Sequence, residues 1–330
     1  MDIKGIKNVL VTGGCGYIGS HVTRQLSEAG FNVVVLDDLS TGFRDALLHG
    51  EKLVIGSTGD QALVKKLIDE HQIDAILHFA ASIVVPESVA EPVKYYTNNT
   101  ANTLKLIDVA SKSKLKGLVF SSTAAVYGTP QRTPVFESDP TEPESPYGWS
   151  KLMSERMLQD TAAATGLKFM ILRYFNVAGA EPKQRLGHRT KDATHLIKVA
   201  CEAATGKRPG MSIFGTDYPT ADGTCIRDYI HIEDLADAHI KSLSYLANGG
   251  QSRILNCGYS RGSSNKQVIA AIKEISGVDF KVDYVARRPG DVMEVVAGAT
   301  QIRNVLGWQP KFDDLKVIVE HAYKFEKLLK

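Results

Sequence analysis

The strongest constraint on the fold is a glycine motif at a strand-to-helix junction near the N-terminus. Its glycines, Gly13, Gly16 and Gly19, are spaced three residues apart. A short apolar, β-branched run at 8–12 precedes them, and residues 17–29 follow with the apolar spacing of a helix. Such a turn needs residues without a Cβ at its tight bend, at its closest approach to a pyrophosphate, and where the helix meets the strand. We therefore expect the N–H groups that begin this helix to face phosphates.

A carboxylate follows the motif at the distance expected for recognition of an adenosine ribose. A second apolar strand, 32–36, ends at Asp37, about twenty residues beyond the glycines. An acid at this place binds ribose hydroxyls, so it favours NAD over NADP. Strand, turn, helix and acid together predict a Rossmann-type dinucleotide site; the alternative is an ordinary turn.

A second signal, Tyr147-x-x-x-Lys151, lies near the middle of the chain. Residues four apart on a helix share one face. A free tyrosine, with a pKa of about 10, is a poor base at neutral pH. A lysine ammonium one turn away and a positive nicotinamide ring would both favour the phenolate. With the hydroxyl of Thr123, which follows a predicted strand, these residues form a candidate catalytic group; the alternative is a surface pair on a helix.

Strands and helices alternate through the first half of the chain. The remaining predicted strands are 53–56, 75–79, 117–122 and 168–173, and the remaining predicted helices are 61–71, about 97–113 and 147–165. This order predicts an α/β fold with a doubly wound parallel sheet. After about Asn176 the chain becomes richer in Gly, Pro and Asp, which suits a smaller C-terminal α/β lobe. We expect an NAD-binding domain over 1–176, a substrate-binding lobe over 177–330, and a return of the chain to the sheet within 229–258.

Composition narrows the class of protein. The chain has 330 residues, 43% of them hydrophobic, and a formal net charge of +2, as in a globular enzyme. Its 39 Lys and Arg are scattered among 37 Asp and Glu, which argues against a nucleic-acid partner. We see neither a membrane span nor a signal peptide, and we expect a cytoplasmic location. The cysteines show neither disulfide nor metal-ligand spacing, so we expect reduced, packed thiols and no metal: Cys15, Cys201, Cys225 and Cys257.

Several motifs resemble the extended short-chain dehydrogenase/reductase family and, within it, the UDP-glucose 4-epimerases. They are Gly-Gly-Cys-Gly-Tyr-Ile-Gly at 13–19, Ser-Pro-Tyr-Gly-Trp-Ser-Lys at 145–151, Arg-Tyr-Phe-Asn at 173–176 and, most specific of all, the run at 215–231. The resemblance covers essentially the whole chain and implies a homodimer that binds NAD. The residues matching the cofactor site are Gly13, Gly16, Tyr17, Ile18, Gly19, Asp37, Phe79, Ala80, Asn98, Tyr147, Lys151 and Tyr174.

The resemblance also implies a reaction, the epimerisation of a UDP-hexose at C4 without net redox change. Tyr147 would take the proton of the 4-hydroxyl while hydride passes from C4 to NAD, and the 4-keto sugar would then turn and accept hydride on its other face. The pocket must hold the UDP firmly and the hexose loosely. The residues matching the substrate site are Thr123 of the catalytic group, Asn176 and His195 near the phosphates, Ser212, Ile213 and Phe214 along the uracil, Arg227 and Arg288 on the diphosphate, and Asp291 on the uridine ribose.

Four positions depart from the usual epimerase pattern. Ile83 stands where many members have a lysine near the cofactor, and Ser57 where many have an acid that reaches the adenine. His195 replaces an asparagine beside the substrate phosphates. Val295 stands where bulkier residues restrict the hexose pocket. The smaller side chain leaves room for a 2-acetamido group, so N-acetylated UDP-hexoses are candidate substrates too.

Two other functions share the predicted fold. A sugar-nucleotide 4,6-dehydratase or decarboxylase needs an acid or base after the Ser/Thr position, where this chain has Ala124 and Ala125. A non-catalytic NAD-sensing regulator would tolerate loss of Tyr147 or Lys151, and both are present. Epimerisation therefore remains the favoured function.

Other polar residues have simpler interpretations. We expect His231 to be a hydrogen-bonded structural histidine, His21 to be solvated or locally bonded, and Lys65 and Lys66 to lie on a solvated helix face.

Overall fold

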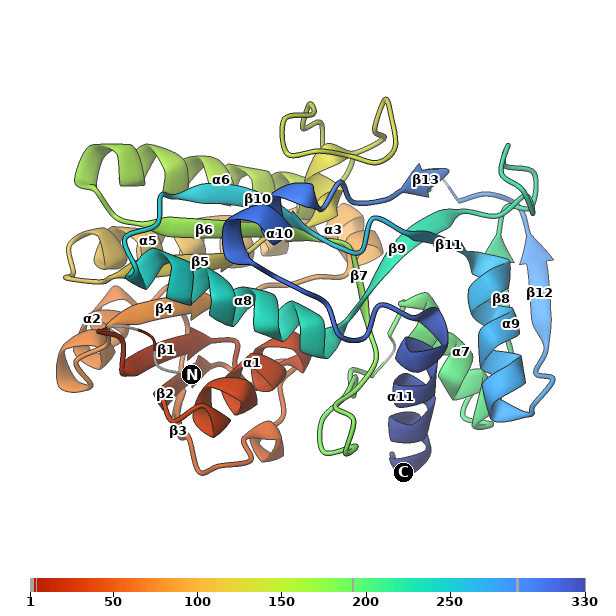
Figure 1. Ribbon diagram of the computed structural model, residues 1–330, viewed down its shortest axis with the longest axis horizontal. Helices are drawn as coiled ribbons and strands as arrows, with labels where there is room; N and C mark the ends of the chain where they lie inside the picture. Colours follow the sequence, from red (N-terminus) through yellow and green to blue (C-terminus); the bar gives the residue numbers. More distant parts are fainter. Residues whose placement is uncertain (1–2, 4, 192, 289–290, 330) are drawn as a thin grey trace.

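A parallel sheet of seven strands organises the computed structural model, which describes residues 3, 5–191, 193–288 and 291–329 (Figure 1). Met1, Asp2 and Lys4, which belong to the N-terminal segment in which we see no signal peptide, lie outside the described residues. The strand order is β10-β6-β5-β4-β1-β2-β3, and every pair is parallel. In chain order the strands are β1 (Asn8–Thr12), β2 (Asn32–Asp37), β3 (Lys52–Ile55), β4 (Ala75–His78), β5 (Gly117–Ser121), β6 (Phe169–Tyr174) and β10 (Arg253–Cys257).

Helices cover both faces of this sheet, because the buried strands carry apolar side chains on both sides. One face packs against α1 (Tyr17–Glu28) and α8 (Ile232–Ala247). The other packs against α2 (Gln61–Glu70), α5 (Asn102–Ser111) and α6 (Pro146–Thr165). The predicted doubly wound α/β fold is therefore confirmed.

Helix α6 carries the predicted catalytic pair, and its ends follow from local sequence. Ser145 caps its start by accepting a hydrogen bond from the N–H of Gly148, and Pro146 occupies the first helical position, where no N–H is needed. The helix ends at Gly166, which adopts the left-handed conformation with φ of 79°. These signals place Tyr147 in the first turn of the helix.

The segment between β4 and α5 is more helical than the sequence predicts. It contains α3 (Val85–Ala90), α4 (Pro92–Tyr95) and a π-helical turn, η2 (Tyr96–Ala101), which runs directly into α5. The predicted start at about residue 97 is therefore late. Two short 3-10 turns, η1 (Arg44–Ala46) and η3 (Ala124–Tyr127), follow β2 and β5.

The rest of the chain builds a smaller region beside the sheet, on the right of Figure 1. Its strands are β7 (Asn176–Ala178), β8 (Met211–Phe214), β9 (Ile226–His231), β11 (Gly262–Ser264), β12 (Val282–Val285) and β13 (Glu294–Val295). Its helices are α7 (Leu196–Ala204), α9 (Asn265–Ser276) and α11 (Leu315–Leu328), whereas α10 (Thr300–Leu306) packs against β10 and α8 of the main sheet. Strand β9 pairs with β7, β11 and β13, while β8 pairs with β12.

The chain returns to the main sheet through α8 and β10. Strand β9 leads into α8, which packs against α1, and then into β10 at the sheet edge beside β6. A late segment thus completes the sheet that the first half begins.

One expectation for a polar residue is wrong. His21 is fully buried rather than solvated, and its Nδ1 lies 2.5 Å from a carboxylate oxygen of Glu233 on α8. The reason is that α8 packs across α1 and covers this face of the helix. The other expectations are confirmed: His231 Nε2 lies 2.9 Å from His321 Nδ1, Lys65 and Lys66 are exposed, and all four cysteines are buried and free.

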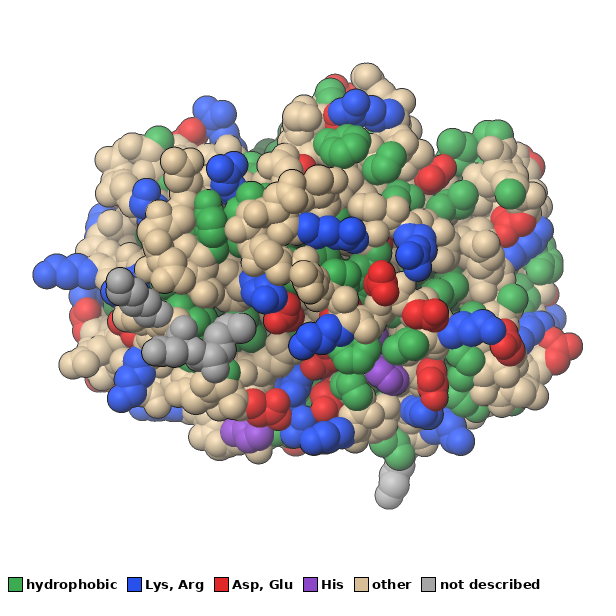
Figure 2. All heavy atoms as spheres, in the orientation of Figure 1, with side chains coloured by type: hydrophobic (Ala, Val, Ile, Leu, Met, Phe, Trp, Pro, Cys, Tyr) green, Lys and Arg blue, Asp and Glu red, His purple; other side chains and the backbone are tan. Residues whose placement is uncertain are grey.

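The visible surface carries charges of both signs. Figure 2 shows Lys and Arg side chains interspersed with Asp and Glu over this face. Among the residues that the structure describes, no helix is both long and apolar enough to cross a bilayer.

Candidate active site

The glycine loop lies where β1 ends and α1 begins, at the carboxyl edge of the sheet. Gly13 has φ of 71°, and a Cβ there would lie 2.6 Å from the amide nitrogen of Ala80. A Cβ on Gly19 would lie 2.1 Å from the carbonyl oxygen of Gly13. Gly16 caps α1, no side chain takes the cap hydrogen bond, and the first turn carries no acid. The N–H groups that begin α1 are thus left for an anion, as a dinucleotide pyrophosphate requires.

Asp37 stands beside this loop at the end of β2. It is 6% exposed, and its carboxylate oxygens accept hydrogen bonds from the N–H groups of Cys15 (2.9 Å) and Leu39 (2.8 Å). Burial raises the pKa of Asp37, while these two hydrogen bonds oppose the rise. Because each carboxylate oxygen has a second lone pair, the group fits two ribose hydroxyls as well as the loop.

Four other predicted cofactor residues follow β4 or end β6. Phe79 and Ala80 continue β4, and Ala80 touches the glycine loop. Asn98, in η2, donates a hydrogen bond to the Ser82 hydroxyl. Tyr174, at the end of β6, accepts one from the Ser121 hydroxyl (3.0 Å). This edge of the sheet therefore brings together predicted cofactor residues from the ends of β1, β2, β4 and β6.

Two of the positions that depart from the epimerase pattern face solvent. Ile83 is 47% exposed, and Ser57 is exposed with its hydroxyl bonded to the N–H of Gly59. In the structure neither residue is held by the core.

Tyr147 and Thr123 meet at the centre of this edge. Tyr147 is 7% exposed, and burial raises its pKa to about 12. A hydrogen bond with the Thr123 side chain opposes this rise. Thr123 itself caps η3 through a hydrogen bond from the N–H of Ala125. The expected influence of Lys151 on the phenol stays a prediction.

Lys151 lies one turn further along α6 and is buried. Its Nζ donates a hydrogen bond to the Ser121 carbonyl oxygen (2.8 Å) and lies 4.9 Å from the centre of the Phe120 ring. Burial lowers the pKa of Lys151 to about 8, and the negative charge of Glu155 opposes this. Lysine and tyrosine are thus both held at the end of β5.

A buried polar network, which the sequence analysis missed, supports this group from behind. Glu155 is fully buried on α6 and forms an ion pair with Arg173 of β6 (2.6 Å). Ser122 donates to the same carboxylate, and Arg173 donates to the hydroxyl of Tyr127 (3.0 Å). The sequence signal was present, because Glu155 lies four residues after Lys151 and shares its helix face.

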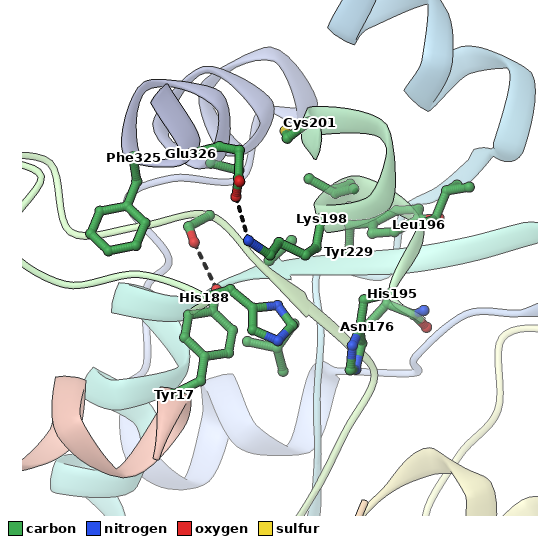
Figure 3. A pocket seen from close by; sticks show the side chains of 15 residues that line it. Tyr17, Asn176, His188, His195, Leu196, Lys198, Cys201, Tyr229, Phe325 and Glu326 are labelled. Carbon is green, nitrogen blue, oxygen red and sulfur yellow. Dashed lines mark hydrogen bonds and ion pairs between the residues drawn. The ribbon is translucent and has the colours of Figure 1, made fainter. Parts of the chain in front are cut away.

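Two predicted substrate residues line a cavity of about 30 Å³ on the other side of the glycine loop (Figure 3). Asn176 begins β7, and His195 caps the start of α7 without a side-chain cap bond. Tyr17 and His188 line the same cavity, as do Lys198 and Glu326, which form a buried ion pair. Such a volume holds about one water molecule.

The remaining predicted substrate residues lie around β8 and β9. Arg288 pairs with Asp291 (3.0 Å) and lies over the Phe214 ring, 4.2 Å from its centre. Arg227 donates to the Ile226 carbonyl oxygen (2.9 Å). Arg227 is thus held by a backbone carbonyl, and Arg288 by an acid and an aromatic ring.

One residue of the predicted uracil segment faces away. Ile213 is 1% exposed and packs in the core, whereas Ser212 and Phe214 are half-buried. Because side chains alternate along a strand, Ser212 and Phe214 share the opposite face of β8. The expectation that the Ile213 side chain lies along the uracil is not supported by this geometry.

The described part of the chain holds no group of three or more His, Cys, Asp or Glu side chains that fits a metal ion.

Comparison with known proteins decides the family. Residues 9–258 match the model of the NAD dependent epimerase/dehydratase family. The chain belongs to this family. A UDP-glucose 4-epimerase of Azospirillum brasilense is 54% identical over 321 residues, which cover 97% of this chain and 92% of that protein.

Solved structures of the same family match over nearly the whole chain. The UDP-glucose 4-epimerase of Brucella ovis, in complex with NAD, is 40% identical with a TM-score of 0.95, covering 97% of this chain and 98% of that one. The UDP-Glc/GlcNAc 4-epimerase of Campylobacter jejuni is 47% identical with a TM-score of 0.86, covering 98% of this chain and 100% of that one. The structural similarity thus covers both the seven-stranded sheet and the smaller region of this chain.

Proposed function

We propose that this protein is an NAD-dependent UDP-hexose 4-epimerase that interconverts UDP-glucose and UDP-galactose. The observation that carries the proposal is the buried Tyr147, beside Thr123 and one helical turn from Lys151, at the same sheet edge as a dinucleotide loop. Family membership and the epimerase relatives support it.

The side chains divide the chemistry between them. When bound, NAD supplies the acceptor and donor of hydride at C4. Tyr147 takes the proton of the 4-hydroxyl as the 4-keto sugar forms, and returns it when the ring has presented its other face. Thr123 holds the phenol by a hydrogen bond, and the Lys151 ammonium stabilises the negative charge that develops on it. The proton balance therefore closes within one turnover.

The substrate diphosphate needs cationic and amide donors outside this centre. We assign Asn176 and His195 to one side of the diphosphate, and Arg227 and Arg288 to the other. Asp291 would accept hydrogen bonds from the uridine ribose. A grip on the nucleotide alone leaves the hexose free to turn.

The deciding experiment is conversion of UDP-galactose by the purified protein without added reductant. An epimerase yields UDP-glucose and comes to a fixed ratio of the two sugars. A 4,6-dehydratase would yield a keto-deoxy sugar instead, and an NAD-sensing regulator would yield neither. Ala124 and Ala125 argue against the dehydratase, because methyl groups transfer no protons.

A second substrate class is favoured by Val295. This residue is half-buried on β13, beside Arg227 of β9. A valine wall leaves space for a 2-acetamido group, so we propose that N-acetylated UDP-hexoses are also substrates. A panel of UDP-sugars, including acetylated and pentose forms, tests this range.

We further propose that the protein works as a homodimer. Large apolar side chains are exposed on adjacent helices α3 to α6: Val89 (65%), Val93 (75%), Leu104 (47%), Trp149 (41%) and Met153 (42%). Such a contiguous patch is typical of an interface. Val93→Glu should produce a monomer in light scattering after gel filtration; an unchanged mass would reject this face.

The division of the chain and its compartment are also proposals. We assign NAD binding to residues 1–176, with the crossover within 229–258, and UDP-sugar binding to residues 177–330. Four buried, free thiols suit a reducing compartment, so we propose the cytoplasm.

A further inference from the structure

His188 occupies a place between the two halves of the proposed site. Its ring stacks on Tyr17, with 4.6 Å between ring centres and planes 7° apart. On its other side it meets the edge of the His195 ring, with 5.0 Å between centres and planes 71° apart. Figure 3 shows the three side chains arriving from separate segments. Both geometries are attractive arrangements of aromatic rings.

The first end of this stack belongs to the cofactor loop. Tyr17 is the first residue of α1 and directly follows Gly16. Its hydroxyl donates a hydrogen bond to the carbonyl oxygen of Gly179 (2.7 Å), three residues after Asn176. Tyr17 is therefore held both by the glycine loop and by the segment that carries Asn176.

The second end belongs to the substrate side. His195 caps α7 and lines the same cavity as Asn176. Its side chain has no cap bond to hold it, and the residue is exposed to solvent. The His195 imidazole can therefore change rotamer unless a neighbouring ring restricts it. A side chain that is restricted before the ligand binds loses less entropy on binding, which raises the affinity for that ligand.

His188 has the properties of such a neighbour. Burial lowers the pKa of His188 well below its ordinary value, so the ring is neutral. A neutral ring stacks on tyrosine without placing a charge of its own near the phosphates. Among the described residues the His188 side chain makes no hydrogen bond, so the two ring contacts are what hold it.

We propose that His188 is a positioning residue, which holds the His195 imidazole at the substrate diphosphate and braces it against Tyr17 of the glycine loop. The proposal rests on the proposed function, because it takes the ligand of His195 to be the diphosphate of a UDP-sugar.

The expected effect is one of binding rather than of chemistry. Losing the two ring contacts should weaken UDP binding about 3- to 10-fold, the range for one or two aromatic pairs. The KM for UDP-sugar should rise by a similar factor while kcat stays within about twofold, since the group acts before the chemical step.

The test is isothermal titration of UDP into the NAD-loaded protein. His188→Leu keeps the bulk of the side chain without an aromatic face, and His188→Phe restores the face. We expect weaker binding for the first and near wild-type binding for the second. His49→Ala, a solvent-facing histidine paired with Glu28, is the matched control and should bind normally.

A double variant shows whether His188 acts through His195. With His195→Ala already in place, adding His188→Leu should cost no further affinity, because the positioned ring is gone. The proposal would be overturned if the double variant lost UDP affinity by the product of the two single-variant factors, or if His188→Leu bound UDP as the wild type does. Either result would leave the proposed epimerase activity intact. A wild-type protein that does not bind UDP at all would overturn the proposed function and this inference together.

Discussion

Replacing Lys151 by Met tests how the buried phenol becomes a base. With a pKa of about 12, the buried Tyr147 is ionised in about one molecule in 10⁵ at pH 7, so its phenolate needs further stabilisation to act as a base. A positive charge close by lowers the pKa of a phenol by about 1 to 3 units. Removing the ammonium should therefore reduce kcat/KM at pH 7 about 10- to 1000-fold. Methionine is nearly as long as lysine, so it fills the same buried space.

The pH profile distinguishes this from a loss of packing. Lys151, with a pKa lowered to about 8, is charged below that pH and neutral above it. Its support of the phenolate is thus complete in acid and is lost as the pH rises through about 8. Wild-type kcat/KM should fall on the alkaline side, whereas that of Lys151→Met should be low at pH 7 and keep rising.

The assay is kcat/KM for UDP-galactose between pH 5.5 and pH 10, with bound NAD and the melting temperature measured alongside. A Lys151→Met profile of wild-type shape would refute the reasoning, because the lysine charge would then not act on the phenol. So would unchanged activity at pH 7. Loss of NAD from the variant would show that Lys151 acts first on the cofactor.

Three further predictions concern single side chains. Tyr147→Phe should lower kcat about a hundredfold or more while NAD stays bound, because only the proton acceptor is removed; near wild-type turnover would reject its role as the base. Val295→Tyr should abolish turnover of N-acetylated UDP-hexose but spare UDP-glucose, since overpacking costs about 1–3 kcal/mol; kcat/KM for both sugars decides, and an equal loss of both would point to another wall. Glu155→Leu leaves the buried Arg173 charge without its carboxylate partner, so it should lower the free energy of unfolding, measured in urea, by about 3–5 kcal/mol. Adding Arg173→Met should recover most of that stability.

Features encoded in short stretches of sequence were predictable. The glycine loop, Asp37 and the Tyr147–Lys151 pair each lie within one turn, strand or helix. Their geometry follows from local rules: a missing Cβ at a bend, a strand end, and residues four apart on a helix face. The alternation of elements predicted the parallel sheet for the same reason.

Contacts between distant segments were not predictable in this way. His21 lies under α8, which the chain supplies more than two hundred residues later, and Glu155 meets Arg173 only because α6 packs over β6. The orientation of Ile213 depends on which face of β8 the core covers. Local propensity carries no information on these choices.

The sequence by itself determined the chemistry on offer: a dinucleotide loop, a phenol, a lysine and a set of anion-binding side chains. The tertiary structure decided which of them meet. Tyr17, His188 and His195 come from three segments and stack only because α1, α7 and the intervening loop share one cavity. The physical reason is that packing depends on the path of the whole chain, whereas helix, strand and turn signals act over a few residues.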